Sequence, residues 1–308
     1  MWQEMSYLSG LDKTWGNGGK LENRGFDVEA TGVVWASPSW QWQVGASVGH
    51  YKNKVTALPD GQRYMDTEIL GATVRTEIGR PANLFYGYKA QGVFSTSAEA
   101  QAAGLYIHDD NGVDRTAFEA GDMHFADLDG DHFITEADRM VIGDPNPDIY
   151  GNIFTSVQYR RLRLDVRFNY SLGNDIYNYT RQQLESGSRF MNQTTALARR
   201  WQMEGQQTDI PRLSFQDPMG NSRFSDRWIE DGSYLRLKTV TLSYDLPVSS
   251  TFLQGLQFWV QANNVVTLTR YLGSDPEGTA LSAVLGQGID AGSLPQSRNF
   301  MVGIKINL

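Results

Sequence analysis

The clearest candidate for chemistry is an acidic segment near the middle of the chain. Residues 127–138 read D-L-D-G-D-H-F-I-T-E-A-D, which places carboxylates at positions 1, 3, 5 and 12 of an EF-hand-like loop. Hard oxygen ligands at this spacing suit Ca²⁺, which would stiffen the loop without taking part in catalysis. The sequence indicates no required cofactor beyond this optional cation. The predicted ligands are Asp127, Asp129, Asp131, the backbone carbonyl of Phe133, Thr135 and Asp138.

Two residues of this segment depart from the EF-hand pattern. Position 6, where the sharp turn favours Gly, is His132, and position 12 is Asp138 instead of the longer Glu. Between Asp122 and Asp148 the chain has eight acids against one base, so the segment repels itself unless a cation is present. The alternative is a solvated acidic turn whose Asp side chains cap their own backbone.

Composition excludes several functional classes. The chain has 308 residues, with 27 Lys and Arg against 35 Asp and Glu, and a net charge of −8 argues against a nucleic-acid partner. The absence of Cys rules out disulfides, zinc-thiolate sites and thiol nucleophiles. The four His lack metal-ligand spacing, and neither H-E-x-x-H nor G-x-S-x-G occurs, so we predict no enzyme. A glycoside hydrolase has only the abundance of carboxylates in its favour.

Two tryptophans in the long segment 173–232 are candidates for ligand contact. An exposed indole at Trp201 or Trp228 could stack on a sugar ring. The alternative is that each indole anchors its loop by packing.

Strict alternation of apolar and polar residues is the main structural signal, because successive side chains of a strand point to opposite faces. In Leu162–Leu172 the even positions are apolar. The polar row that alternates with them is Arg161, Arg163, Asp165 and Arg167. Similar patterns predict strands at 21–35, 41–51, 64–76, 152–160, 234–245, 256–268 and 300–308. The apolar register changes between Leu237 and Val240, which indicates a β-bulge.

Strand length and loop length together favour a membrane barrel. Strands of about 10 residues match a tilted crossing of a bilayer. Short connections alternate with long ones, and the long ones predict external loop regions at 76–150, which contains the acidic segment 127–138, and at 173–232. The predicted fold is therefore all-β, an antiparallel meander forming part of a transmembrane β-barrel with long external loops. The polar row of residues 161–167 would then face an aqueous lumen.

Strand direction adds a constraint on residues 64–76. A strand there can cross the membrane only with a partner, for which residues 84–94 are the candidate. Without such a partner, the segment lies outside the membrane.

The order of sequence segments resembles one protein family over nearly the whole chain, from about residue 21 onward. The segments are L-E-N-R-G-F-D-V-E-A (21–30), F-Y-G-Y-K-A-Q-G-V-F (85–94), G-D-M-H-F-A-D-L-D-G-D (121–131), D-R-M-V-I-G-D-P-N-P (138–147), G-N-D-I-Y-N (173–178), S-D-R-W-I-E-D-G-S-Y-L-R-L-K-T-V-T-L-S-Y-D-L-P (225–247), Q-A-N-N-V-V-T-L-T-R-Y (261–271), S-D-P-E (274–277) and P-Q-S-R-N-F-M-V-G-I-K (295–305). The chain resembles the C-terminal barrel portion of a SusC/RagA-type TonB-dependent outer-membrane receptor.

The resemblance implies a barrel of about 22 strands that is closed by a plug domain. It further implies import of oligosaccharides or peptides across the outer membrane, with a SusD-like lipoprotein as partner and TonB as the source of energy. Residues 1–308 would supply about eight strands of such a barrel, surrounded by outer-membrane lipid. Because the plug and the TonB box are not recognised in it, we expect the chain to be a fragment.

A soluble protein remains the alternative. A surface β module that binds glycans with its Trp-bearing loops and a Ca²⁺-stabilised loop would also show alternation. Such a module must cover its apolar rows with a second sheet.

Overall fold

Seven long antiparallel strands form one sheet in the part of the chain that the structure describes. The structure, a computed structural model, describes residues 2–4, 13–15, 18–108, 114–248, 252, 254–279 and 284–307. The sheet has the order β20-β18-β17-β14-β13-β4-β3, and every pair in it is antiparallel. Its strands are β3 (Lys20–Ala36), β4 (Trp40–Ala57), β13 (Ile149–Tyr159), β14 (Leu162–Leu172), β17 (Tyr234–Leu246), β18 (Gly255–Thr269) and β20 (Asn299–Asn307).

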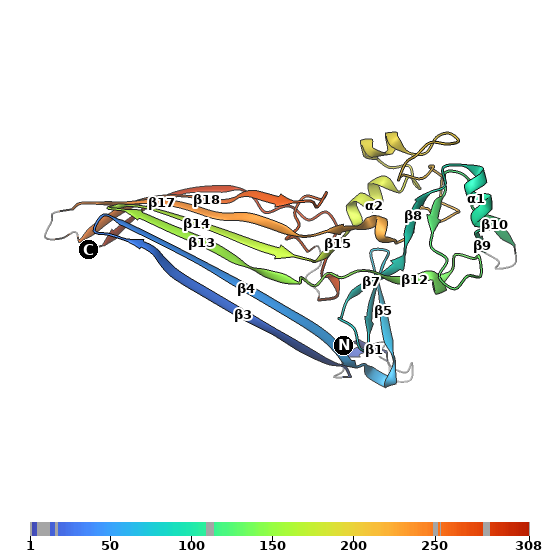
Figure 1. Ribbon diagram of the computed structural model, residues 1–308, viewed down its shortest axis with the longest axis horizontal. Helices are drawn as coiled ribbons and strands as arrows, with labels where there is room; N and C mark the ends of the chain where they lie inside the picture. The colour runs from blue at the N-terminus through green and yellow to red at the C-terminus, as the bar shows by residue number, and fades with distance from the viewer. Residues whose placement is uncertain are drawn as a thin grey trace.

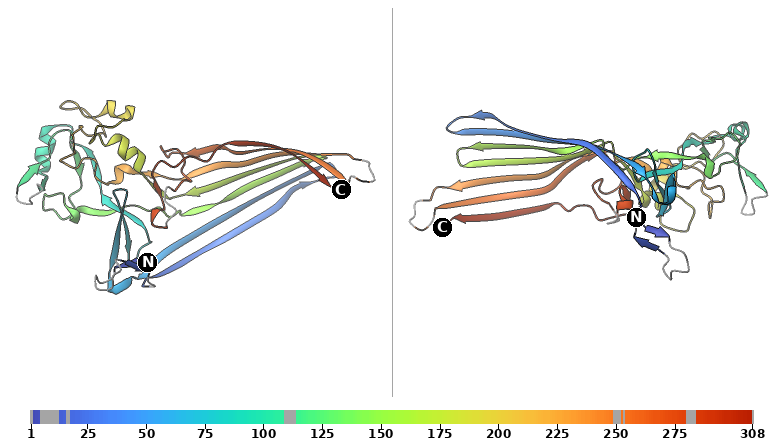
Figure 2. Two further views of the ribbon diagram at one scale, coloured as in Figure 1. Left: turned by 180° about the vertical axis from the view of Figure 1, so that it is seen from behind. Right: turned by 90° about the horizontal axis from the view of Figure 1, so that it is seen from below.

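The sheet is a single curved layer with short turns at one end and the other elements gathered at the opposite end (Figures 1 and 2). Seven of the predicted strands are confirmed, with extensions of a few residues at their ends. Residue 308, the last of the predicted C-terminal strand, lies outside the described residues.

The predicted strand at 64–76 is instead a hairpin outside the main sheet. Leu70 and Gly71 both have positive φ, 52° and 78°, which is the geometry of a tight two-residue hairpin turn. Since 84–94 does not join the main sheet either, the described part of that sheet has seven strands and not eight. The hairpin belongs to a four-stranded sheet of β5 (Tyr64–Ile69), β6 (Ala72–Glu77), β7 (Leu84–Tyr88) and β12 (Arg139–Gly143).

The long segments between the sheet strands also contain regular structure. None of the helices in the described residues is long and apolar enough to cross a membrane. The remaining strands and the α-helices are β1 (Trp2–Glu4), β2 (Lys13–Trp15), β8 (Ala90–Val93), α1 (Ser97–Ala103), β9 (Tyr106–His108), β10 (Arg115–Ala117), β11 (Met123–Phe125), β15 (Asp175–Asn178), α2 (Tyr179–Glu185), β16 (Ile229–Asp231) and β19 (Ile289–Asp290). The 3₁₀ turns are η2 (Pro59–Gly61), η3 (Glu136–Asp138), η4 (Thr195–Arg199), η5 (Asp226–Trp228) and η6 (Val284–Gly286).

Two buried apolar clusters lie among these loop elements, and the main sheet contributes no buried member to either in the described residues. One cluster is centred on Met123 and Phe125, and the other on Tyr177 and Trp228. The apolar rows of the main sheet are exposed instead. No second sheet packs over them in the described parts of the chain, so the arrangement that a soluble module requires is not seen.

The predicted bulge is confirmed at Lys238. Arg167 pairs with Thr239 and Phe168 pairs with Leu237, so Lys238 is an extra residue between two regular stretches of β17. The pairing of β17 with β18 shifts at the same place. Leu237 and Val240 therefore share the apolar face although they are three positions apart, an odd spacing that would place them on opposite faces of a regular strand.

Candidate functional site

The two faces of the main sheet differ in chemistry across the six strands from β4 to β20. One row across six strands, from β4 to β20, is apolar: Trp42, Val157, Leu164, Leu242, Val260 and Val302. The next row, on the opposite face, is Gln43, Ser156, Asp165, Thr241, Gln261 and Met301. Within the apolar row Val260 is 46% exposed and Val302 is 79% exposed, which is far above a protein core. The apolar face therefore contacts the surroundings of the protein.

An aromatic row lies on the apolar face beside the short turns. The rings of Trp40 and Tyr159 are 4.5 Å apart, and Tyr244 pairs with Phe258 two strands further on. Aromatic side chains near the strand ends, on the apolar face, are typical of the membrane-water interface of a barrel. This row was not predicted from the sequence, although the parity of the alternation marks its residues as members of the apolar face.

The predicted polar row of β14 lies on the face opposite to its apolar row. Arg163 Nε donates to both carboxylate oxygens of Asp165, at 3.0 and 2.9 Å. Arg167 makes no side-chain hydrogen bond or ion pair with the described residues. Arg161 lies in the turn before β14, where its carbonyl accepts a hydrogen bond from Asp245 N. The hollow of about 300 Å³ on this face is lined by Phe154, Thr155, Arg163, Asp165, Val166, Arg167, Thr239 and Thr241.

A buried ion-pair network ties the loop after β18 to the polar face. Arg236 is 2% exposed, pairs with Asp275, and donates from Nη1 to Glu277 Oε2 at 2.6 Å. Lys238 Nζ donates to the same Glu277 oxygen at 3.1 Å. Burial acts to raise the pKa of Asp275, but the hydrogen bond from Arg236 and the N–H of Gln296 outweigh it and hold that pKa below its usual value. The network thus holds the loop after β18 against the polar face of the main sheet.

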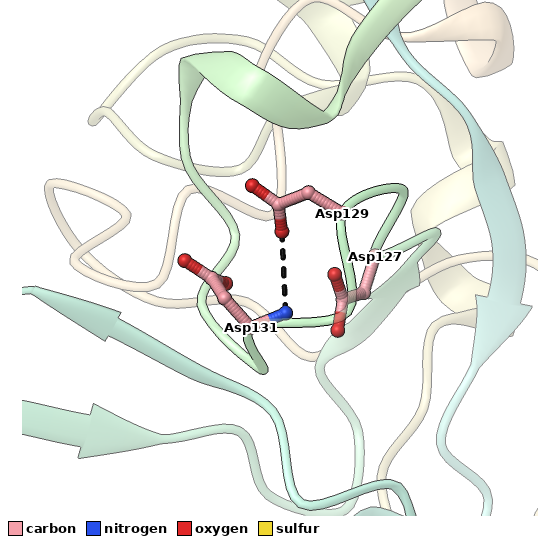
Figure 3. A group of neighbouring side chains, drawn as sticks. All are labelled: Asp127, Asp129 and Asp131. Atoms are coloured by element: carbon pink, nitrogen blue, oxygen red, sulfur yellow. Dashed lines mark hydrogen bonds between the residues drawn. The ribbon is translucent and has the colours of Figure 1, made fainter.

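The structure brings three of the predicted cation ligands together. One carboxylate oxygen from each of Asp127, Asp129 and Asp131 lies within 4.8 Å of the other two (Figure 3). Asp127 accepts hydrogen bonds from the N–H groups of Gly130 and His132, at 2.7 and 3.0 Å. His132 has a φ of 67°, so it takes the left-handed conformation that Gly provides in an EF-hand loop.

Electrostatics in this loop favours a cation. The N–H of Asp131 acts to lower the pKa of Asp129, but desolvation and repulsion from Asp131, Asp138 and Asp127 raise that pKa above its usual value. Desolvation acts to raise the pKa of Asp127, but the hydrogen bonds from the N–H groups of Gly130 and His132 lower this pKa below its usual value. A divalent cation would relieve the repulsion at Asp129.

The other three predicted ligands take part in hydrogen bonds that involve backbone N–H groups of the loop. Asp138 is fully buried and accepts from the N–H groups of Leu128 at 2.8 Å and Thr135 at 2.7 Å. Thr135 Oγ1 accepts from Ala137 N at 3.2 Å, and Phe133 N donates to Asp131 at 2.6 Å. Asp138 and Thr135 therefore form a capping box, as the alternative of a self-capped turn predicts. Cation binding by Phe133, Thr135 and Asp138 stays a prediction.

The two candidate tryptophans are both packed into the loop region. Trp228 is fully buried and its indole N–H donates to the carbonyl of Arg223 at 3.1 Å, so it presents no face to a ligand. This corrects the prediction of ligand contact for Trp228. Trp201 is half-buried, lies over Gly121 and donates to the carbonyl of Ser95 at 3.1 Å. Its role as a loop anchor is therefore favoured.

Comparison with known proteins gives one consistent answer. No protein-family model matches the chain. The chain is 30% identical to TonB-dependent receptor P3 of Formosa agariphila, over 97% of this chain and 30% of that receptor. It is 26% identical to TonB-dependent receptor P26 of the same organism, again over 97% of this chain and 30% of the relative. These curated relatives are named as receptors and not as enzymes.

Solved structures give the same fold. The structure of the RagAB peptide transporter matches with a TM-score of 0.74 and 24% identity, over 98% of this chain and 31% of that chain. The RagAB peptide importer in the 'open-open' state also matches with a TM-score of 0.74 and 24% identity, over 100% of this chain and 31% of that chain. The seven-stranded sheet is therefore part of a transmembrane β-barrel with long external loops. Over 97% of its length the chain is therefore similar to TonB-dependent receptors, and it spans about 30% of the length of the curated relatives it matches.

Proposed function

We propose that this chain supplies barrel wall and external loops to an importer of nutrients in the outer membrane. The exposed apolar face of the main sheet carries the proposal, because a large exposed apolar face marks a contact with lipid or with another protein, and its alternation with a polar face is that of a barrel wall in lipid. The similarity to TonB-dependent receptors and to a peptide transporter supports it. We infer an oligosaccharide or a peptide as substrate, a SusD-like lipoprotein as partner and TonB as the source of energy.

On this proposal the polar face of the sheet lines the lumen of the barrel. Arg161, Arg163, Asp165 and Arg167 would contact water, a plug domain or a passing solute. Arg167 is exposed and has no partner among the described residues, so its guanidinium is free to make such a contact. In the described part of the sheet, the outer face has no comparable polar row.

Two neighbouring residues in the middle of β17 provide a sharp test. Val240 lies on the apolar face and Thr241 on the polar face. An Arg on the lipid face of a barrel costs about 2–4 kcal/mol near the bilayer midplane, whereas an Arg in the lumen is tolerated. We therefore expect Val240→Arg to lower the yield of folded receptor in membranes strongly, and Thr241→Arg to lower it little.

The measurement is membrane fractionation of the exported receptor, followed by the heat-dependent gel shift of a folded barrel. Equal yields for the two variants would contradict a lipid-facing apolar row. Recovery of the parent as a soluble monomer without detergent would overturn the proposal as a whole.

We also propose that Asp127, Asp129 and Asp131 bind a divalent cation such as Ca²⁺ in an external loop. The three carboxylates converge, and desolvation together with repulsion from Asp131, Asp138 and Asp127 raises the pKa of Asp129 above its usual value. Binding would neutralise this repulsion and stiffen the loop. Protons should compete with the cation, so affinity should fall as the pH is lowered.

Calorimetry with CaCl₂ tests this second proposal. We expect Asp127→Asn and Asp129→Asn to weaken binding at least tenfold. The matched control is Glu136→Gln, because Glu136 lies in the same segment but points its exposed carboxylate to Arg139. In the absence of cation Asp129→Asn should raise the melting temperature, since it removes repulsion. No heat of binding with the parent receptor would end the proposal.

A further inference from the structure

A cavity of about 590 Å³ lies among the loop elements, beside α2 and the segment 215–224. This volume is within the range of sites that bind small ligands. Most of its lining is polar, and the residues that matter here are Gln182, Arg189, Phe215, Gln216, Asp217 and Arg223.

The lining has a surplus of positive charge. Its carboxylate, Asp217, is satisfied within its own turn: it accepts from Asn221 N at 2.7 Å, and from Ser222 N and Oγ at 2.7 and 2.6 Å. Arg223 donates to the carbonyls of Gly220 and Met219, which are neutral acceptors. Arg189 is exposed, and its guanidinium has no hydrogen bond or ion pair with the residues that the structure describes. An anion could therefore bind here without displacing an existing partner.

An exposed aromatic pair lies at the cavity, with Phe215 in its lining and Phe190 stacked on Phe215. The rings of Phe190 and Phe215 stack with centroids 4.8 Å apart and an interplanar angle of 28°. Phe190 is 92% exposed and Phe215 is 57% exposed, and Phe215 also lines the cavity. Two large rings that stack on each other while facing water form an apolar surface suited to a ligand.

The backbone beside this aromatic pair is held in an unfavourable conformation. Gln216 and Asp217 are consecutive non-glycine residues with positive φ, 62° and 50°. The surrounding structure holds them there through the hydrogen bond from Gln216 N to the carbonyl of Ser188 at 2.9 Å and through the bonds to the Asp217 carboxylate. Backbone strain of this kind concentrates at functional sites. Gln216 lines the cavity, and its carboxamide makes no hydrogen bond with other described side chains.

We propose that this cavity binds a small amphipathic carboxylate, such as a short peptide or an acylated amino acid. The apolar group of the ligand packs on Phe215 and Phe190, its carboxylate pairs with Arg189, and its amide meets Gln216. The unpaired guanidinium of Arg189 favours an anion over a neutral sugar, because a neutral sugar has no negative charge to pair with it. The inference rests on the proposed importer function and narrows its substrate class.

The experiment uses the full-length receptor, purified in detergent, and two probes that differ only in charge. N-acetylphenylalanine carries the ring, the amide and the carboxylate, whereas N-acetylphenylalaninamide lacks the negative charge. We expect calorimetry to show at least tenfold tighter binding of the acid. Arg189→Gln should abolish this difference, and Phe215→Ala should weaken binding of both probes. The control Arg199→Gln changes an exposed arginine outside the cavity lining and should change neither affinity.

Several results would overturn the proposal. These are no binding of the acid, equal binding of acid and amide by the parent, an unchanged preference in Arg189→Gln, or binding of a neutral trisaccharide in place of the acid. The outcome is separate from the test of membrane insertion at Val240 and Thr241. If those variants behave as expected while the acid does not bind, the cavity assignment fails and the importer proposal stands.

Discussion

A buried carboxylate holds the two long external segments together. Asp122 is fully buried and accepts hydrogen bonds from Arg212 Nε at 2.9 Å and Arg212 Nη2 at 3.0 Å. It also accepts from Asn221 Nδ2 and from the N–H of Glu119, each at 2.9 Å. The guanidinium of Arg212 therefore links residues that are 90 positions apart.

Replacing Arg212 by Met should destabilise the loop region by about 2–3 kcal/mol. Breaking a buried ion pair costs about 3–5 kcal/mol. The loss should be smaller here, because the side chain of Arg212 is 34% exposed and Asp122 keeps two other donors. At about 2–4 °C per kcal/mol, the midpoint of loop unfolding should fall by about 4–12 °C.

Tryptophan emission during thermal unfolding of the detergent-purified receptor can follow this change. Trp201 lies over Gly121, whose carbonyl accepts from Arg212 N at 2.7 Å, so its indole reports on this contact. A Trp201→Phe background identifies its share of the signal. Arg199→Met serves as the control for loss of a surface charge.

A double variant tests whether the pair itself is responsible. Because Asp122→Asn removes the buried charge that Arg212→Met leaves behind, the double variant should lose less stability than the sum of the two single variants. Strictly additive losses, or an Arg212→Met midpoint within about 1 °C of the parent, would refute this reasoning.

Three further predictions use the same loop region. Trp228→Ala should cost about 3–5 kcal/mol in thermal unfolding, because it empties the centre of a buried cluster. Gly121→Ala should cost about 1–3 kcal/mol in the same assay, because its Cβ would meet the ring of Trp201 and its φ is 87°. Burial, and then the hydrogen bond to Asp290, raise the pKa of Tyr271 above its ordinary value of 10.0. Stability should therefore fall as the pH rises above about 10, where the unfolded phenol ionises and the folded one does not, and Tyr271→Phe should lose less in urea titrations at pH 9 to 11.

The faces of the sheet strands were accessible from the sequence because alternation has a fixed period of two. Leu164 and Asp165 lie on opposite faces, and the slip at Lys238 is a bulge, as that period requires. The hairpin at 64–76 was missed because two short strands around Leu70 and Gly71 alternate much as one long strand does.

The contacts described above could be predicted from the sequence only where the contacting residues are close together in the chain. The spacing of Asp127, Asp129 and Asp131 was enough to predict that their carboxylates converge. It could not reveal that Asp138 is buried and bonded to the backbone, because that depends on how the following turn folds. The pair of Arg236 and Asp275 spans 39 positions, and no local pattern indicates which distant acid a strand arginine will meet.

The extra residue in β17 has an evolutionary consequence. The residues on both sides of Lys238 already alternate as one uninterrupted strand, so its deletion would leave Leu237 and Thr239 on their present faces. The deletion would remove the ion pair between the Lys238 ammonium group and Glu277. Pairing with β14 would become regular, whereas on the other side Asn264 and Val265 of β18, which now face Lys238 alone, would face no residue of β17. A one-residue difference in length at this point should therefore be felt at β18 and in how firmly the loop after β18 is held.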